Sequence, residues 1–309
     1  MIKIVVTSIA FSKNEFLVKK IKSIFSNVIL NNDGKRFSKK ELIEYLSDAD
    51  GAIVGLDKID FSILDKSKKL KIISKYGVGL DNINIEDCKK KDITVGWTGG
   101  VNRTSVAEMA LGFMLMLSRN LYITSNQLKN GKWNKNGGFQ LSGKTVGIIG
   151  TGYVGKELIK LLKPFACNIL VNDIIEQDDY YNKNNLIKTT KENIYKNADI
   201  ISIHTPLTDK TYNMITINEM LMMKKNAYII NTARGGIINE LDLKHALQHG
   251  IISGAAMDVY FEEPPEDQEM LQLINLIATP HIGGNAKEAV EAMGMSSIYH
   301  LEKYFKGGL

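Results

Sequence analysis

The sequence predicts an α/β protein in which two doubly wound parallel sheets form two domains. Short β-branched runs alternate with segments of helical periodicity along the chain, which is the pattern of consecutive βαβ units. The length of 309 residues is sufficient for two such domains. A glycine-rich turn between a predicted strand and a predicted helix begins at Gly150, and nearly half of the chain precedes it.

The first half of the chain predicts an α/β domain of its own. Its expected strands are KIVVTS from Lys3, NVILN from Asn27, GAIVG from Gly51, KIISKYG from Lys71 and ITVGW from Ile93. A lysine-rich helix and the helix KKELIEYLSDA from Lys39 separate the earlier strands. Because parallel strands need long crossover connections, helices are expected on both faces of this sheet.

A strongly apolar helix, RTSVAEMALGFMLMLSRN from Arg103, is expected to connect the two domains. Ser105 and Glu108 have the spacing of a capping box that would open it. The apolar run MALGFMLML is too short to cross a bilayer, so it predicts a buried helix and no membrane partner.

A second α/β series follows this helix. Its expected strands are KTVGIIG from Lys144, NILVND from Asn168, ADIISIHTP from Ala198, AYIINTA from Ala227, GAAMDVY from Gly254 and LIATPHIGG from Leu276. A helix from Ala286 to Phe305 is expected to end the chain.

Composition excludes several classes of function. The formal net charge of +5 comes mostly from lysines scattered over predicted helices, without a basic stripe, so no nucleic-acid partner is expected. Cys88 and Cys167 are far apart and predict reduced thiols. The chain starts directly with an apolar run and lacks the pattern of a signal peptide. We therefore expect a cytoplasmic protein.

Gly150, Gly152 and Gly155 form a dinucleotide-binding turn between a predicted strand and a predicted helix. The first glycine permits the tight turn, the second lets a pyrophosphate approach, and the third lets the helix pack closely on the strand. Asp173 ends the next strand, where a carboxylate can accept the ribose 2′-hydroxyl hydrogen bond and repel a 2′-phosphate. These features predict NAD rather than NADP.

The later strands end in loops that carry reactive side chains. In an open parallel sheet, ligands bind outside the carboxyl ends of the strands, so these loops are expected to meet at one site. Arg234 is one of only four arginines, and its planar fork suits a carboxylate ligand, although pairing with a neighbouring acid is an equal alternative. His245 and His249 could share a helix face, but no third ligand is apparent and no metal is expected.

These motifs together resemble the D-isomer-specific 2-hydroxyacid dehydrogenases, and among them the phosphoglycerate dehydrogenases. The resemblance rests on YGVGLDNI from Tyr76, SVAE from Ser105, GTGYVG with Asp173, HTPLT from His204, TARGGIINE from Thr232, GAAMDVYFEEPP from Gly254 and TPHIGG from Thr279. It implies a Rossmann NAD-binding domain, residues 99–283, inserted into a flavodoxin-like substrate domain, residues 1–98 plus 284–309. Crossings near Gly99 and Gly283 would form a hinge beside the catalytic cleft.

The resemblance also implies the site residues. Arg234, Glu263 and His281 would be catalytic; Glu263 is chosen over Glu262 because it directly precedes Pro264. The NAD site would contain Gly150, Gly152, Tyr153, Val154, Gly155, Asp173, Thr205, Ala233, Asp258 and Gly284. The substrate site would contain Lys75, Gly77, Val78, Gly79 and Arg234, with backbone amides of residues 77–79 binding the substrate carboxylate.

The implied reaction interconverts a D-2-hydroxy acid and its 2-oxo acid. Arg234 would hold the carboxylate, and His281 would donate a proton to the alkoxide that forms as NADH delivers hydride. Glu263 would hydrogen-bond the other ring nitrogen and favour the imidazolium.

3-Phosphoglycerate is the leading substrate, with glyoxylate, hydroxypyruvate and lactate-type substrates as alternatives. The chain departs from the phosphoglycerate pattern at Gly55, Leu56 and Asp57, which offer no arginine, so Lys58, Lys75 or a lysine near Trp133 would have to bind the phosphate. An NAD-sensing corepressor-like protein and a formate dehydrogenase are further alternatives, but the three catalytic residues favour the 2-hydroxyacid enzyme. The resemblance also implies a homodimer, and no regulatory serine-binding domain is expected.

Overall fold

The computed structural model describes residues 1–307; the last two residues of the predicted substrate domain, 308 and 309, lie outside the described residues. The chain forms two compact units, Met1–Asn102 with Asn285–Leu309, and Arg103–Gly284. The sequence places the boundaries after residues 98 and 283, and the structural units divide after residues 102 and 284.

The first unit contains a five-stranded sheet in the order β2-β1-β3-β4-β5. Its strands are β1 (Lys3–Val6), β2 (Asn27–Leu30), β3 (Gly51–Val54), β4 (Ile72–Lys75) and β5 (Thr94–Gly96). All neighbouring strands pair in parallel, and the order is the flavodoxin-like one. The predicted α/β class of this half is confirmed.

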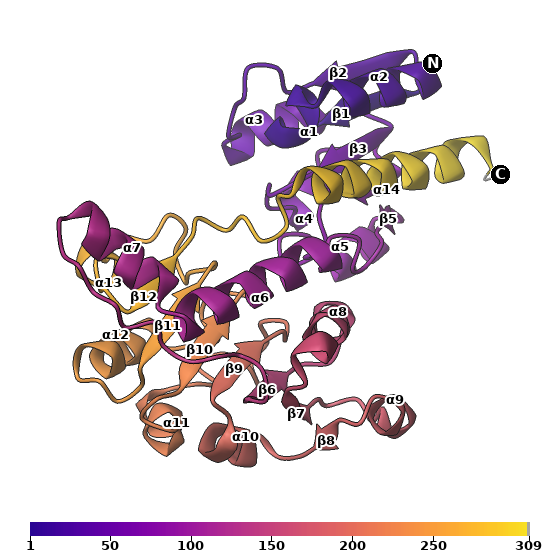
Figure 1. The fold of residues 1–309 in the computed structure, drawn as a ribbon. Coiled ribbons are helices and arrows are strands. Elements are labelled where there is room, and N and C mark those ends of the chain that lie inside the picture. The colour runs from indigo at the N-terminus through magenta and orange to yellow at the C-terminus, as the bar shows by residue number, and fades with distance from the viewer. Residues whose placement is uncertain (308–309) are drawn as a thin grey trace. The chain divides into compact units, whose positions relative to one another are not determined.

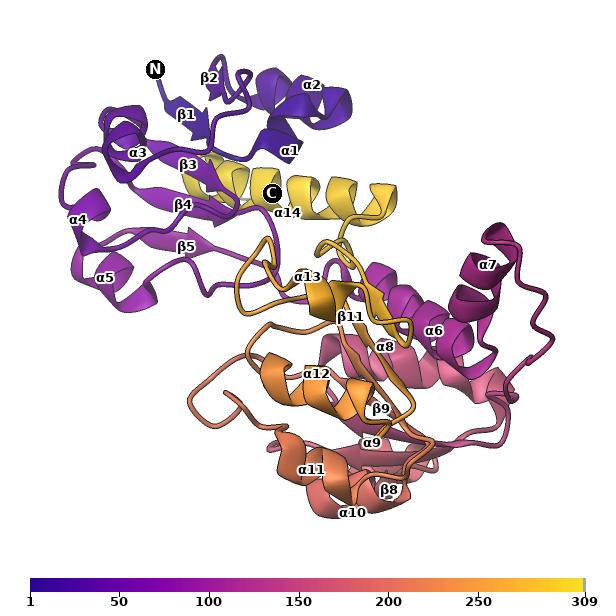
Figure 2. The same cartoon turned by 90° about the vertical axis from the view of Figure 1, so that its left-hand side faces the viewer.

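Helices cover both faces of this sheet, as Figure 2 shows. They are α1 (Ile9–Lys13), α2 (Glu15–Ile24), α3 (Lys39–Leu46), α4 (Phe61–Leu64), α5 (Ile85–Lys90) and α14 (Lys287–Lys306). One apolar core contains side chains of α3, α4 and α5, and the other contains side chains of α1, α2 and α14. The terminal helix α14 therefore belongs to the core of this unit, and Ser74 of β4 donates a 2.8 Å hydrogen bond to its Ser297 carbonyl oxygen.

The second unit contains a seven-stranded parallel sheet in the order β12-β11-β10-β9-β6-β7-β8 (Figure 1). Its strands are β6 (Thr145–Ile149), β7 (Asn168–Asn172), β8 (Ile187–Lys188), β9 (Ile200–Ile203), β10 (Tyr228–Asn231), β11 (Gly254–Met257) and β12 (Leu276–Ala278). This is the Rossmann strand order, in which the chain reverses direction across the sheet between β6 and β9. That reversal locates the expected cofactor crevice at the carboxyl ends of these two strands.

Two helical layers enclose the second sheet. The helices are α6 (Arg103–Ser118), α7 (Leu121–Lys129), α8 (Tyr153–Leu162), α9 (Asp178–Lys183), α10 (Lys191–Asn197), α11 (Ile217–Met222), α12 (Glu240–Gln248) and α13 (Gln268–Leu271), with a 3₁₀ turn at Lys163–Phe165. Side chains of α6 and α8 fill one core, and side chains of α10, α11 and α12 fill the other.

The predicted capping box of α6 is wrong. The helix begins at Arg103, so Ser105 lies inside its first turn instead of preceding it. The Ser105 hydroxyl donates to the Gly283 carbonyl oxygen at 2.5 Å, which ties α6 to the loop that follows β12. Within residues 1–307, no single helix has the length and apolarity needed to span a membrane, whereas α6 and α7 pass that test only as a pair bent by 64°.

Candidate active site

The glycine turn after β6 has the geometry that a dinucleotide needs. Gly150 has a φ of +96°, and a Cβ there would lie 2.6 Å from the His204 carbonyl oxygen. A Cβ at Gly155 would lie 2.1 Å from the Gly150 carbonyl oxygen, so helix α8 reaches its present position only with glycine. Both glycines are therefore required by close backbone packing.

Gly152 differs from the other two glycines because a Cβ there would meet no atom within 4 Å. It is the N-cap residue of the ten-residue helix α8, and no side chain caps the helix there. Tyr153 and Val154 form the first turn. Open space at a helix N-terminus is where a pyrophosphate binds, and the residues present therefore fit the cofactor.

Asp173 directly follows β7 and is held in place by the glycine turn. Its Oδ2 accepts hydrogen bonds from the Thr151 backbone N–H at 2.6 Å and from the Thr151 hydroxyl at 3.0 Å. The Thr151 hydroxyl also lies 2.8 Å from the Tyr181 hydroxyl. Thr151 and Tyr181 are positioning groups that the sequence reasoning missed, since the middle residue of a glycine motif gives no signal of its side-chain contacts.

His204 and Thr205 directly follow β9, one of the two strands next to β6. The Thr205 hydroxyl oxygen is buried and has no hydrogen-bond partner among residues 1–307, and the same is true of Thr232 after β10. His204 Nε2 lies 2.9 Å from the Ser202 hydroxyl, and burial lowers the pKa of His204 from 6.5 to about 4. A neutral imidazole next to the turn and two unpaired hydroxyls suit a polar ligand at this edge.

Arg234 lies in the loop that follows β10. Its Nη1 donates to the Ala233 carbonyl oxygen at 2.7 Å. Asn231, the last residue of β10, accepts from the Ala233 N–H at 3.0 Å and donates to the Arg234 carbonyl oxygen at 2.8 Å. The loop around the arginine is therefore held from the buried end of the strand.

His281 and Glu263 form a direct pair. His281 Nδ1 lies 2.8 Å from Oε2 and 3.0 Å from Oε1 of Glu263. The Tyr260 backbone N–H donates to Glu263 Oε1 at 3.2 Å, which fixes the carboxylate from its own loop. His281 has a φ of +52°, an uncommon conformation for a residue with a side chain. Glu263, and not its neighbour Glu262, is thus the carboxylate on the histidine.

Asp258 fixes the loop that carries His281. This residue follows β11 and is 1% exposed. Its Oδ1 accepts from the Thr279 hydroxyl at 2.6 Å and from the Ile282 N–H at 2.9 Å, and its Oδ2 accepts from the Gly283 N–H at 2.7 Å. The three donors lie on both sides of His281, so one buried carboxylate accounts for the position of the loop that ends at Gly284.

The three predicted catalytic residues come from the ends of neighbouring strands. Arg234 follows β10, Glu263 follows β11 and His281 follows β12, and these strands are adjacent and parallel in the sheet. Since carboxyl ends of parallel strands share one edge, the three side chains and the glycine turn after β6 lie along the same edge of the second unit. The arrangement supplies a cationic fork, an acid–base imidazole and its carboxylate partner.

The predicted substrate residues Lys75, Gly77, Val78 and Gly79 lie in the first unit, at the end of β4 and in the loop after it. Lys75 is buried, and its Nζ donates to the Gly55 carbonyl oxygen and to Asn82 Oδ1, both at 2.6 Å. Their role in substrate binding stays a prediction.

The remaining histidines form no metal site. The ring centroids of His245 and His249 lie 4.1 Å apart at the end of α12 with the ring planes tilted by 31°, and His300 Nε2 lies 2.8 Å from the Thr98 hydroxyl. Within residues 1–307 there is no group of three or more His, Cys, Asp or Glu side chains that could bind a metal.

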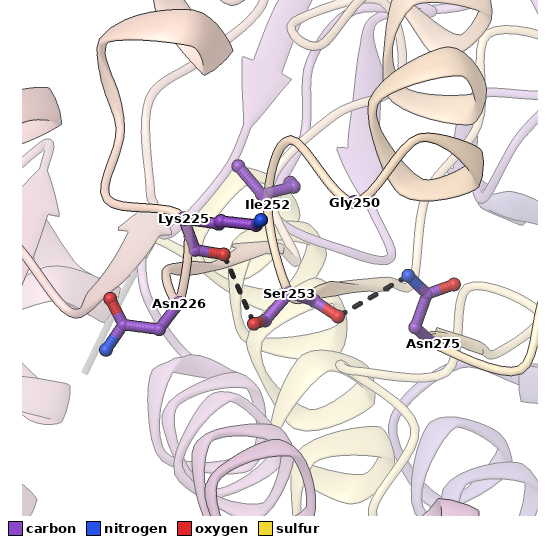
Figure 3. Close-up of a pocket in the computed structure, with 6 residues that line it drawn as sticks. All are labelled: Lys225, Asn226, Gly250, Ile252, Ser253 and Asn275. Carbon is purple, nitrogen blue, oxygen red and sulfur yellow. Dashed lines mark hydrogen bonds between the residues drawn. The ribbon is translucent and has the colours of Figure 1, made fainter.

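A surface pocket lies away from these residues (Figure 3). It has a volume of about 490 Å³ and is lined by Lys225, Asn226, Gly250, Ile252, Ser253 and Asn275. These residues precede β10, β11 and β12, so the pocket lies at the opposite edge of the sheet from Arg234 and His281. A second hollow of about 200 Å³ includes Tyr260, Phe261 and Glu262 among its lining residues.

Comparison with known proteins identifies the family. Residues 111–283 match the family model described as D-isomer specific 2-hydroxyacid dehydrogenase, NAD binding domain. The chain belongs to the D-isomer-specific 2-hydroxyacid dehydrogenases. NAD is accordingly the cofactor of the second unit, as the sequence predicted.

Relatives within this dehydrogenase family carry different names. The chain is 39% identical over 282 residues to a D-3-phosphoglycerate dehydrogenase of Methanocaldococcus jannaschii, covering 88% of this chain and 53% of that protein. It is 34% identical over 293 residues to a glyoxylate reductase of Thermococcus litoralis, covering 92% and 88%. The NAD⁺-bound 3-phosphoglycerate dehydrogenase structure from Entamoeba histolytica is 31% identical with a TM-score of 0.81, covering 100% and 96%. The chain thus spans about half of the first relative and most of the other two.

Proposed function

We propose that this chain is an NAD-dependent oxidoreductase that interconverts a D-2-hydroxy acid and its 2-oxo acid. The observation that carries the proposal is the pairing of His281 Nδ1 with both carboxylate oxygens of Glu263, at the same sheet edge as Arg234. This pairing assigns the proton on Nδ1 to the Glu263 bond and makes Nε2 the nitrogen that exchanges a proton with substrate.

Each residue then has a defined task. Arg234 binds the substrate carboxylate through its planar fork and polarises the adjacent carbonyl. When bound, the cofactor would supply the hydride as NADH in the reductive direction and accept it as NAD⁺ in the oxidative direction. His281 donates a proton from Nε2 to the alkoxide oxygen in reduction and takes the hydroxyl proton in oxidation. Glu263 orients the ring and stabilises the imidazolium.

3-Phosphoglycerate is the leading candidate substrate. The support is the 39% identity to the relative named D-3-phosphoglycerate dehydrogenase and the structural similarity to the enzyme of the same name from Entamoeba histolytica. Glyoxylate or hydroxypyruvate is the alternative, because the chain covers more of the relative named glyoxylate reductase. D-lactate-type substrates remain a third candidate.

A screen of NADH oxidation tests the function and the substrate together. The purified chain is assayed with 3-phosphohydroxypyruvate, hydroxypyruvate, glyoxylate and pyruvate, and then repeated with the Arg234→Ala and His281→Ala variants. We expect His281→Ala to lose at least about 100-fold in kcat/KM, the usual size of a general acid–base contribution. Arg234→Ala should lose a similar factor, about 100-fold, because a preorganised electrostatic contact to the reacting group is removed. His245→Ala, an exposed histidine on α12, is the matched control and should retain activity. Undiminished turnover in either site variant would contradict the proposal.

We further propose a homodimer formed through α6 and the segment around Trp133. The support is apolar surface in this region, since Trp133 is 79% exposed and Leu128 is 56% exposed. Light scattering coupled to size exclusion should give twice the monomer mass of 34.5 kDa. Trp133→Glu should shift the protein toward the monomer, and a monomeric wild type at micromolar concentration would refute the proposal.

A further inference from the structure

Asn231 is a buried amide that the reaction scheme leaves without a role. It ends β10, whose other residues are Tyr228, Ile229 and Ile230, and it is 0% exposed. Its position in the middle of the sheet, paired with Ile203 of β9 and Met257 of β11, is one where an apolar residue would be expected. Burial of an amide is unfavourable unless its donor and acceptor are both paired.

Both ends of this amide are paired to the same short loop. Oδ1 accepts from the Ala233 N–H at 3.0 Å, and Nδ2 donates to the Arg234 carbonyl oxygen at 2.8 Å. An asparagine side chain supplies both an acceptor oxygen and an N–H₂ donor, whereas ionised aspartate supplies only acceptors and leucine supplies neither. The two bonds lie on either side of the peptide between Ala233 and Arg234, so they set the orientation of that peptide group.

The orientation of this peptide determines where the guanidinium is held. The Ala233 carbonyl oxygen belongs to it and accepts a 2.7 Å hydrogen bond from Arg234 Nη1. Rotation of the peptide would move this acceptor and release Nη1. Asn231 therefore acts on the fork of Arg234 through this peptide: its amide bonds the flanking Ala233 N–H and Arg234 carbonyl oxygen, and the Ala233 carbonyl oxygen between them accepts from Nη1.

The other side of the arginine is fixed by close packing. A Cβ at Gly235 would lie 1.8 Å from the Tyr260 carbonyl oxygen, and Gly236 has a φ of +77°. The loop is thus confined after Arg234 by the Tyr260 backbone and before it by Asn231. Loss of the amide removes the confinement on one side only, so we expect displacement of the arginine without collapse of the loop.

We propose that Asn231 is a positioning residue that presents the Arg234 guanidinium to the substrate carboxylate. The inference rests on the proposed function, in which Arg234 binds that carboxylate. Asn231 itself does not contact substrate. Its removal should weaken substrate binding and turnover together, because a displacement of about 1 Å at a binding group can cost about 100-fold in rate.

The first test compares Asn231→Ala with Asn275→Ala. Asn275 also donates from Nδ2 to backbone carbonyl oxygens, those of Leu247 at 3.1 Å and Ser253 at 3.4 Å, but it precedes β12 at the opposite edge of the sheet. We expect Asn231→Ala to lower kcat/KM for the 2-oxo acid by about 10- to 100-fold while the NADH dissociation constant changes by less than about twofold. Asn275→Ala should leave kcat/KM unchanged. An equal kcat/KM for Asn231→Ala and Asn275→Ala would overturn the inference.

The second test asks whether Asn231 acts through Arg234. In an Arg234→Ala background, the Asn231→Ala substitution should cost almost nothing further, since residues that act as a unit are non-additive. A full additional loss would overturn the positioning role alone. Full activity of Arg234→Ala by itself would instead overturn the proposed function, and the inference with it.

Asn231→Ser keeps the test valid if the alanine variant does not fold. A serine hydroxyl can still accept from the Ala233 N–H but cannot bridge to Arg234 as the amide does. We expect an intermediate loss in kcat/KM, between wild type and about 100-fold, with NADH binding retained. A folded serine variant with wild-type kcat/KM would overturn the positioning role.

Discussion

Substitution of Gly235 by alanine should disable catalysis without disabling cofactor binding. In the structure, a Cβ at Gly235 would lie 1.8 Å from the Tyr260 carbonyl oxygen and 2.5 Å from the Phe261 backbone nitrogen. Real Cβ atoms essentially never approach within 3.0 Å of such atoms, so one of the two loops must move by about 1.2 Å. The Phe261 N–H is held by Glu240 Oε1 at 2.6 Å, which leaves the loop of Arg234 to move.

The expected effect follows from that displacement. A shift of about 1 Å in a substrate-binding group costs about 100-fold in rate, so we expect kcat/KM of Gly235→Ala to fall by roughly that factor. The assay is steady-state NADH oxidation with the preferred 2-oxo acid, combined with NADH affinity from fluorescence titration. NADH affinity should stay within about twofold, because the glycine turn after β6 is untouched.

Gly152→Ala is the matched variant with the opposite expectation. A Cβ at this position enters open space at the start of α8, so the folded protein should be as stable as wild type while NADH binding weakens. If Gly235→Ala retains wild-type kcat/KM, the tight fit around the Arg234 loop does not control catalysis. If Gly152→Ala binds NADH normally, the pyrophosphate site is assigned to the wrong turn.

Three further predictions concern pH, loop anchoring and cofactor choice. Because the pKa of His204 is lowered from 6.5 to about 4, the unfolded chain binds more protons than the folded chain between these pH values, and the free energy of unfolding should fall by roughly 3 kcal/mol as the pH drops from 6.5 toward 4. In urea unfolding, the free energy of unfolding of His204→Asn should depend less on pH, and the same pH dependence as wild type would contradict the lowered pKa of His204. In Asp258→Asn, an amide N–H₂ faces either the Gly283 N–H or the Thr279 and Ile282 donors, so the free energy of unfolding should fall by about 1–3 kcal/mol and kcat should fall too. Wild-type stability and kcat would show that the Asp258 carboxylate does not anchor the loop that carries His281. NADH should be preferred over NADPH by at least about 10-fold in kcat/KM, and Asp173→Ser should narrow that ratio; a wild-type preference for NADPH would refute the role of Asp173.

Local sequence patterns predicted most of the fold. Every strand of the first unit and all but one strand of the second lie within a run that the sequence predicts as a strand. The exception is β8, Ile187–Lys188, where both residues are exposed and only two pair with β7. Such a short edge strand buries no side chain and leaves no alternation to detect.

The candidate site was predictable where its chemistry lies in contiguous motifs. The glycine turn, Arg234, Glu263 and His281 each follow a recognisable strand, and parallel-sheet topology then brings them to one edge. Asn231 and Thr151 were missed because their importance comes from contacts that spacing does not encode. A signal for Asn231 did exist, since a lone amide closing the apolar strand YIIN needs buried partners.

The capping box expected at Ser105 failed for a similar reason. The spacing of Ser105 and Glu108 satisfies the local rule, but the helix starts two residues earlier and the hydroxyl bonds to Gly283 instead. A carbonyl oxygen from a loop far along the chain offers a partner that a local pattern cannot anticipate.

Single-turnover hydride transfer in a His281→Asn variant tests the central claim most directly. The variant, preloaded with NADH, is mixed with saturating 2-oxo acid and the loss of NADH absorbance is followed by stopped flow. If His281 donates the proton from Nε2, the rate constant should fall by about 100- to 10,000-fold while NADH affinity is unchanged. A rate constant within a few-fold of wild type would contradict the claim that the His281–Glu263 pair performs the acid–base step.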